Sequence, residues 1–89
     1  MSLIIQIDMF TRLFTLTIMD KNQQIIENKQ FNNETEYTIF LHEFIKQSKE
    51  QINITLSSTS FSFVEKYVDE LVKLKTHEYA NKINKIEVV

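Results

Sequence analysis

Asp8 is the side chain whose type and place in this sequence most suggest chemistry. It lies in an alternating run of apolar and polar residues near the N-terminus, and a carboxylate inside a strand is disfavoured and usually has a reason. Two interpretations are open: a relic of an active site that still makes a metal or polar contact, or a hydrogen-bonded residue at the end of a strand. Two-metal phosphodiester chemistry needs several carboxylates that hold two ions about 4 Å apart. Asp8 alone does not meet that need, so we expect no catalytic residue, no metal site and no cofactor.

The other polar groups form no catalytic constellation. Glu65 has a role in a helix cap, and residues 69 and 70 are acidic surface charges that precede Lys73. His42 and His77 are not spaced as a pair of metal ligands, and we expect both to be solvated. The hydroxyl-rich residues 57–62 have no base nearby in the sequence, and entry into a helix explains them.

Binding to nucleic acid requires clustered Lys and Arg side chains. The chain has 10 basic and 12 acidic residues, a net charge of −2, and lysines that alternate with carboxylates in its second half. This pattern disfavours a nucleic-acid partner but leaves a weak basic edge open. That edge would consist of Lys73, Lys75, Lys82 and Lys85.

Two features of the sequence favour a protein partner. Phe61 and Phe63 are flanked by serines at the entry to a helix, where both cannot easily face the core. We expect one of them to form part of an apolar contact patch. An open sheet edge is a second route to a partner strand or to a second copy of the chain.

Five expected strands and two expected helices position these residues. Strand patterns cover residues 3–10, 13–19, 24–31, 52–57 and 86–89. Asn33 with Glu36 and Ser62 with Glu65 are capping-box patterns, followed by apolar stripes that predict helices over residues 34–50 and 62–75. An end of the second helix at residue 82, through Tyr79 and Ala80, is the alternative. The order β-β-β-α-β-α-β predicts an α/β domain with a mixed sheet, in which a three-strand meander joins a parallel pair.

The composition is that of one small folded domain spanning residues 1–89, with 43% hydrophobic and 25% charged residues. Cysteine is absent, so stability must come from packing or association. No apolar run is long enough to span a membrane and no leader pattern is present, so we expect a cytoplasmic protein.

Glycine is absent too, so we expect Asn or Asp wherever a turn needs positive φ.

Several of these residues follow one another as they do in a known family. The segments are Ile5-Gln6-Ile7-Asp8, then Asp20-Lys21-Asn22 with Ile25-Ile26, and finally residues 55–60. This order resembles the start of the RuvC-like domain of DEDD-type insertion-sequence transposases, in the ribonuclease H-like superfamily. The resemblance implies a ribonuclease H-like half-fold and places Asp8 where the family has its first metal-ligating acid. Ser57 stands in place of the second acid and Ser60 in place of a glycine, and the remaining acids would lie beyond Val89.

These observations lead us to expect a non-enzymatic protein-interaction module that binds through a sheet edge, an acidic helix face or the Phe61 and Phe63 region. Nine lysines against one arginine, together with abundant Ile and Asn, indicate A/T-rich codons and a phage or mobile-element origin. An inhibitor of a host or defence protein is the more specific form of this hypothesis. A degenerate transposase or nuclease module that still binds nucleic acid or metal is the alternative, and a homodimer used in assembly is a third.

Overall fold

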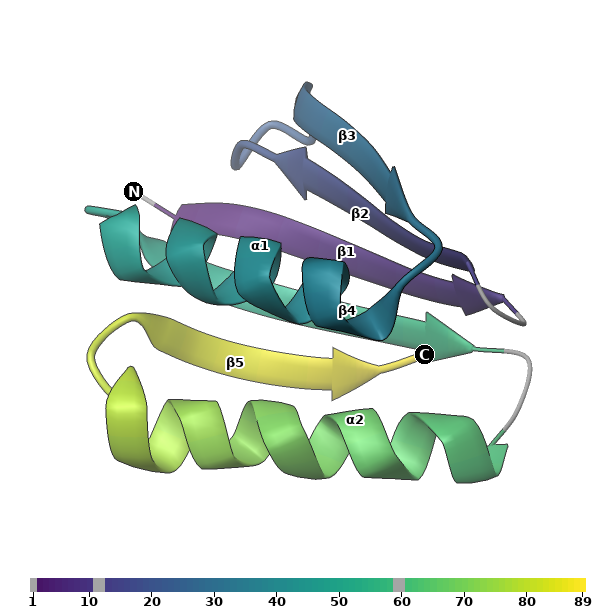
Figure 1. Cartoon of the computed structure of the whole chain (residues 1–89). Helices are drawn as coiled ribbons and strands as arrows, with labels where there is room; N and C mark the ends of the chain where they lie inside the picture. The colour runs from purple at the N-terminus through teal and green to yellow at the C-terminus, as the bar shows by residue number, and fades with distance from the viewer. Residues whose placement is uncertain (1, 11–12, 59–60) are drawn as a thin grey trace.

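A computed structural model gives the structure of the protein and describes residues 2–10, 13–58 and 61–89. Its elements are β1 (Ser2–Phe10), β2 (Leu13–Met19), β3 (Ile25–Phe31), α1 (Glu34–Gln47), β4 (Gln51–Ser58), α2 (Phe61–Lys73), the π-helical turn η1 (Leu74–Glu78) and β5 (Ile83–Val88). The predicted order of strands and helices is confirmed. The strands form one mixed sheet in the order β3-β2-β1-β4-β5 (Figure 1), which is the strand order of a ribonuclease H-like half-fold.

The sheet joins an antiparallel half to a parallel half. β2 runs antiparallel to both β1 and β3, as expected for strands that follow one another through short connections. β4 runs parallel to both β1 and β5; the chain reaches β4 from β3 through α1 and passes from β4 to β5 through α2 and η1, which gives the long connections that parallel pairs need. The predicted meander and parallel pair are therefore confirmed.

One continuous hydrophobic core lies between the sheet and the helices. Residues of β2 alternate strictly between buried and half-buried, because successive side chains of a strand point to opposite faces. The helices contribute every third or fourth residue of their apolar stripes, as their sequence spacing predicts. The buried residues are Ile5, Ile7, Met9, Phe14, Leu16, Ile18, Tyr37, Leu41, Ile45, Ile52, Ile54, Leu56, Tyr67, Leu71, Leu74 and Ile83.

Both helices pack on the same face of the sheet. The Phe14 ring stacks on the Tyr37 ring of α1 with centroids 4.8 Å apart, and it meets the Tyr67 ring of α2 edge-on at 5.6 Å. Figure 1 shows α1 in front of β1 and β4, and α2 running alongside β5 at the bottom of the view. The opposite face, which we call the open face, is covered by neither helix. It carries the half-buried residues Ser2, Ile4, Gln6 and Asp8 of β1, Leu13, Thr15, Thr17 and Met19 of β2, and Asn53, Thr55 and Ser57 of β4.

The ends of the helices refine the predicted boundaries. Asn33 caps α1 as predicted, and its side chain accepts hydrogen bonds from the backbone amides of Thr35 and Glu36. The helix ends at Gln47 rather than at residue 50, because Ser48 is extended and its hydroxyl bonds locally to the backbone of Glu50. α2 already begins at Phe61, so Ser62 lies inside the helix and its predicted role as the cap is wrong.

The second helix and the last strand also differ in extent from the prediction. α2 ends at Lys73 and continues into η1, where Tyr79 donates its backbone amide to the Leu74 carbonyl oxygen at 2.7 Å. β5 then begins at Ile83, three residues before the predicted start. Ile83 pairs with Ile52 and is buried, so the first residue of the strand belongs to the core.

The turn between β2 and β3 solves the absence of glycine in an unexpected way. Gln23 has a φ of 65°, so the expectation that Asn or Asp would occupy such a position is wrong here. The Asp20 side chain instead accepts hydrogen bonds from the backbone amides of Asn22 and Gln24, at 2.8 and 3.0 Å. These bonds hold the turn in an Asx-type geometry and place Gln23 in the left-handed region.

Candidate functional site

The structure brings Asp8 and Ser57 together on the open face. They are direct partners in the parallel register of β1 and β4, which puts their side chains on the same side of the sheet. The Ser57 hydroxyl donates to Asp8 Oδ1, and the Gln6 amide donates to Asp8 Oδ2 at 3.4 Å. The two positions that the sequence resemblance assigns to acids are thus neighbours in space, but one holds a serine.

This arrangement accounts for Asp8 as a hydrogen-bonded strand residue. Neutral donors occupy both of its carboxylate oxygens, so the half-buried charge is compensated locally. In the part of the chain that the structure describes, no group of three or more His, Asp or Glu side chains is placed to hold a metal ion. The geometry therefore supports a polar contact within the sheet.

We expect the Asp8–Ser57 contact to be measurable by a double-mutant cycle. Asp8→Ala, Ser57→Ala and the double variant should give a coupling energy of about 1.5–3 kcal/mol in urea unfolding, because a hydrogen bond to a charged group contributes about that much. Additive effects of the two single substitutions would contradict this contact.

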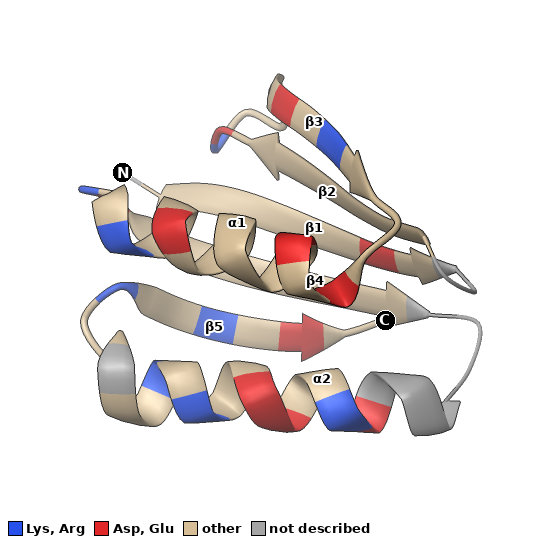
Figure 2. Ribbon diagram, viewed as in Figure 1, with Lys and Arg blue, Asp and Glu red and all other residues tan. Residues whose placement is uncertain are grey.

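The lysines of the predicted basic edge do not gather on one surface. Lys73 is the last residue of α2 and Lys75 lies in η1, whereas Lys85 pairs in register with Asn53, which faces the open face. Lys82 donates to the backbone carbonyl of Lys46, and Lys85 forms an ion pair with Glu87. Blue and red residues are interspersed along α2 and β5 (Figure 2), which disfavours a continuous phosphate-binding track.

The remaining predicted residues have mixed outcomes. The side chains of Phe61 and Phe63 lie outside the described residues, so the predicted contact patch there stays a prediction. His77 is exposed in η1, as expected. His42 is half-buried, and its ring lies edge-on to that of Tyr79 with centroids 6.3 Å apart, so the expectation that it is simply solvated is wrong.

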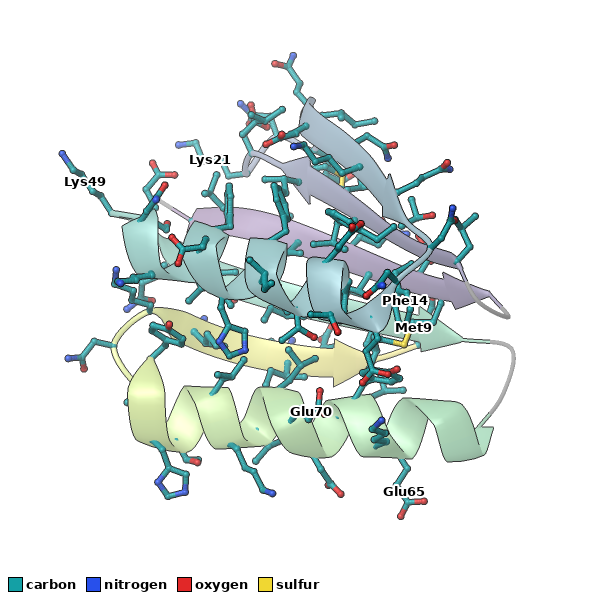
Figure 3. All side chains as sticks on the ribbon, in the orientation of Figure 1. Met9, Phe14, Lys21, Lys49, Glu65 and Glu70 are labelled. Atoms are coloured by element: carbon teal, nitrogen blue, oxygen red, sulfur yellow. The ribbon has the colours of Figure 1, made fainter. Side chains whose placement is uncertain are left out.

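A cleft of about 520 Å³ lies between α1 and α2, within the volume range of small-ligand pockets. Its floor is apolar and comes from both helices through Leu41, Leu71 and Leu74. Its polar lining comes from both helices and consists of Glu34, Thr35, Tyr37, Thr38 and His42 on α1 and Tyr67, Glu70 and Lys73 on α2. Glu70 points from α2 toward α1, whereas Glu65 points away on the other side of α2 (Figure 3).

The two tyrosines of the cleft have unusual environments. Tyr37 is only 2% exposed, and its hydroxyl has no hydrogen-bond partner among the described residues. Burial raises the pKa of Tyr37, and the negative charge of Glu70 adds to the effect. Burial also raises the pKa of Tyr67 to about 12, together with a hydrogen bond to Glu34. Both rings are therefore held in the neutral form beside carboxylates.

Sequence reasoning missed this cleft. It placed both tyrosines in apolar stripes, which is correct for their rings but ignores their hydroxyl groups. The signal available was that each helix carries a tyrosine in its stripe and a glutamate three residues away, Glu34 before Tyr37 and Glu70 after Tyr67. Their convergence depends on both helices packing on one face of the sheet, which the periodicity of each helix alone does not specify.

Comparison with models of known protein families gives no match. Comparison with curated proteins gives no match either. Among the described residues, no helix is long and apolar enough to cross a membrane. Inference about function therefore depends on the geometry of this chain.

Proposed function

We propose that this chain is a non-enzymatic protein-interaction module that accepts a strand of a partner protein along β3. The observation that carries the proposal is that β3 is an edge strand, which within the described part of the chain pairs with β2 alone, and that five of its seven residues are exposed. Such an edge presents unpaired backbone donors and acceptors, which another strand can satisfy. The partner is a protein with an extended apolar segment.

The start of β3 gives this edge an apolar contact. Ile25 and Ile26 are 65% and 58% exposed. In the sheet register Ile25 is the partner of Met19, which is in turn the partner of Ile4. We call these three residues the apolar row. It crosses β1, β2 and β3 on the open face, so a strand added beside β3 would extend it by one side chain.

The charged residues of β3 leave that edge accessible. A lysine on an edge strand often discourages pairing, but Lys29 lies over the Phe40 ring of α1 at 4.8 Å and forms an ion pair of 3.6 Å with Glu27. These contacts draw the ammonium group toward the helix side of the sheet. The open-face side of β3 carries the neutral residues Asn28 and Gln30.

Affinity capture with paired variants tests this proposal. We expect Ile25→Lys with Ile26→Lys to weaken partner binding at least tenfold, because two exposed apolar contacts are replaced by charges. Val72→Lys is the matched control, since Val72 is an exposed apolar residue of α2, far from β3 in the fold. Equal binding by the wild type and the β3 variant, or equal loss in both variants, would contradict the proposal.

The proposal also covers the origin and the target of the protein. We propose that a phage or mobile element encodes it and that it acts in the cytoplasm as an inhibitor of a host or defence protein. Such an inhibitor needs only a surface that binds its target. Alternatively, a second copy of the chain pairs with the β3 edge and forms a homodimer. Light scattering distinguishes the two, because a homodimer forms without any added partner.

The second candidate is a degenerate transposase or nuclease module. The observation that favours it is the contact between Asp8 and Ser57, the two positions at which the resembled family has acids. Salt-sensitive binding to nucleic acid that is lost in Asp8→Ala would support this candidate. Nucleic-acid binding that Asp8→Ala leaves unchanged would rule out a role for this residue.

A further inference from the structure

The cleft between α1 and α2 contains a hydrogen-bonding group that the described part of the protein does not satisfy. The Tyr37 hydroxyl is buried and has no partner there, which is uncommon because buried polar groups are nearly always paired. Tyr37 belongs to the lining of the cleft. A ligand in the cleft that carries a polar group would satisfy this hydroxyl.

The negative charge beside Tyr37 determines which kind of polar group a ligand of the cleft should carry. Glu70 is the carboxylate that acts most strongly on the Tyr37 hydroxyl, and it points into the space between the helices (Figure 3). No lysine lies within ion-pair distance of Glu70 in the described part of the chain. A carboxylate and two aromatic rings together favour a cation, because the ring faces and the carboxylate are all negative.

Lys66 of this protein is itself a cation bound at Glu34, the other carboxylate considered in the cleft. Its ammonium group lies 3.2 Å from Glu34 Oε1 and 5.5 Å from the centroid of the Tyr67 ring. One tyrosine and glutamate pair of the cleft thus already holds an ammonium group. Tyr37 and Glu70 are the second such pair, and no ammonium group of the described residues is bound to them.

We propose that this cleft binds a small aliphatic amine in its protonated form. The ammonium group donates hydrogen bonds to Tyr37 Oη and to the Glu70 carboxylate. The aliphatic stem packs on the apolar floor formed by Leu41, Leu71 and Leu74. This site lies on the helix face, so it is independent of the strand-binding edge proposed above.

Lys73 is the group that opposes this binding. It also lines the cleft, one turn of α2 beyond Glu70, and its ammonium group repels a second cation. Neutralising Lys73 should therefore strengthen binding, whereas neutralising Glu70 should weaken it. These opposite signs separate a specific site from a general response to changes in net charge.

The test uses three probes of one chain length, which are hexylammonium, hexanol and hexanoate. Each is titrated into the isotope-labelled protein while backbone amide chemical shifts of α1 and α2 are followed by NMR. We expect saturable shifts with hexylammonium, and binding at least tenfold weaker for the other two, because they lack the charge-assisted hydrogen bonds. Hexanol that binds as tightly as hexylammonium would overturn the proposal.

Variants locate the site. Glu70→Gln should weaken hexylammonium binding at least tenfold, Tyr37→Phe roughly three- to tenfold, and Lys73→Gln should strengthen it. Glu65→Gln is the matched control, since it removes the same charge from the opposite side of α2 (Figure 3), and should leave binding unchanged. Equal weakening by Glu65→Gln and Glu70→Gln would overturn the proposal.

The same titration distinguishes a free amine from the lysine side chain of a partner protein. Acetyl-lysine amide, with a free side-chain ammonium group, presents that group on a peptide backbone. Binding no tighter than that of hexylammonium supports a small amine as the ligand. Binding at least tenfold tighter would assign the cleft to a partner's lysine and overturn the small-molecule form of the proposal.

Discussion

Phe14→Ala should lower the free energy of unfolding by about 3–5 kcal/mol, the range for truncating a buried aromatic residue. Phe14 is 4% exposed, and its ring contacts one tyrosine from each helix. Removing it opens a cavity where the sheet and both helices meet and removes two aromatic contacts. Since small domains have a total stability of about 5–15 kcal/mol, we expect a largely destabilised protein.

Thr15→Ala is the control for this prediction. Thr15 is the next residue of β2 and points to the open face, so its truncation removes no core contact. We expect a loss of less than about 1 kcal/mol, as for surface substitutions. Urea unfolding followed by circular dichroism measures both values, and equal losses would show that the two faces of the sheet are assigned wrongly.

Stability should fall steeply at alkaline pH. The pKa of Tyr67 is raised from 10.0 to about 12, first by burial and then by its hydrogen bond to Glu34 and the charges of Glu34 and Glu70. The pKa of Tyr37 is raised as well. Below pH 10 the tyrosines are neutral in both states, so their contribution is fully present. Above pH 10 the unfolded chain loses its protons first, and each unit of pKa difference corresponds to about 1.4 kcal/mol of stability lost.

The window that Tyr67 sets runs from pH 10 to about pH 12, and urea midpoints across it measure the loss. Lys66, which pairs with Glu34 and lies over the Tyr67 ring, is retained in every variant. Tyr67→Phe should make the profile less steep, because it removes one of the two tyrosines whose pKa is raised. Tyr79→Phe is the control, since this ring packs beside His42 outside the tyrosine and glutamate cluster. A profile that is as steep in Tyr67→Phe as in the wild type would contradict the assignment.

The sequence predicted the architecture well because its signals are local and repeated. Alternation in residues 13–19 identified β2 to the residue, and Asn33 identified the start of α1. The ends of elements were less predictable, because they depend on contacts made after folding. β5 begins at Ile83 because that residue is buried against Ile52, a distant pairing that no local pattern shows.

The two candidate sites also differ in how far the sequence could predict them. The Asp8–Ser57 contact was suggested by the sequence, because both residues lie on strands whose order could be inferred. The cleft was not, because Tyr37 and Tyr67 are 30 positions apart in the chain, and their rings meet each other and Phe14 only once both helices pack on the sheet. Apolar periodicity identifies a buried face but does not indicate a hydroxyl left without a partner.

Hydrogen exchange of the free and partner-bound protein tests the central claim most directly. The account predicts that amide exchange in β3 (Ile25–Phe31) slows at least tenfold on binding, because the outward-facing amides of an edge strand gain hydrogen bonds from an added strand. Exchange in α1 should change little. Slowing confined to the helices, with β3 unaffected, would contradict a strand-binding module.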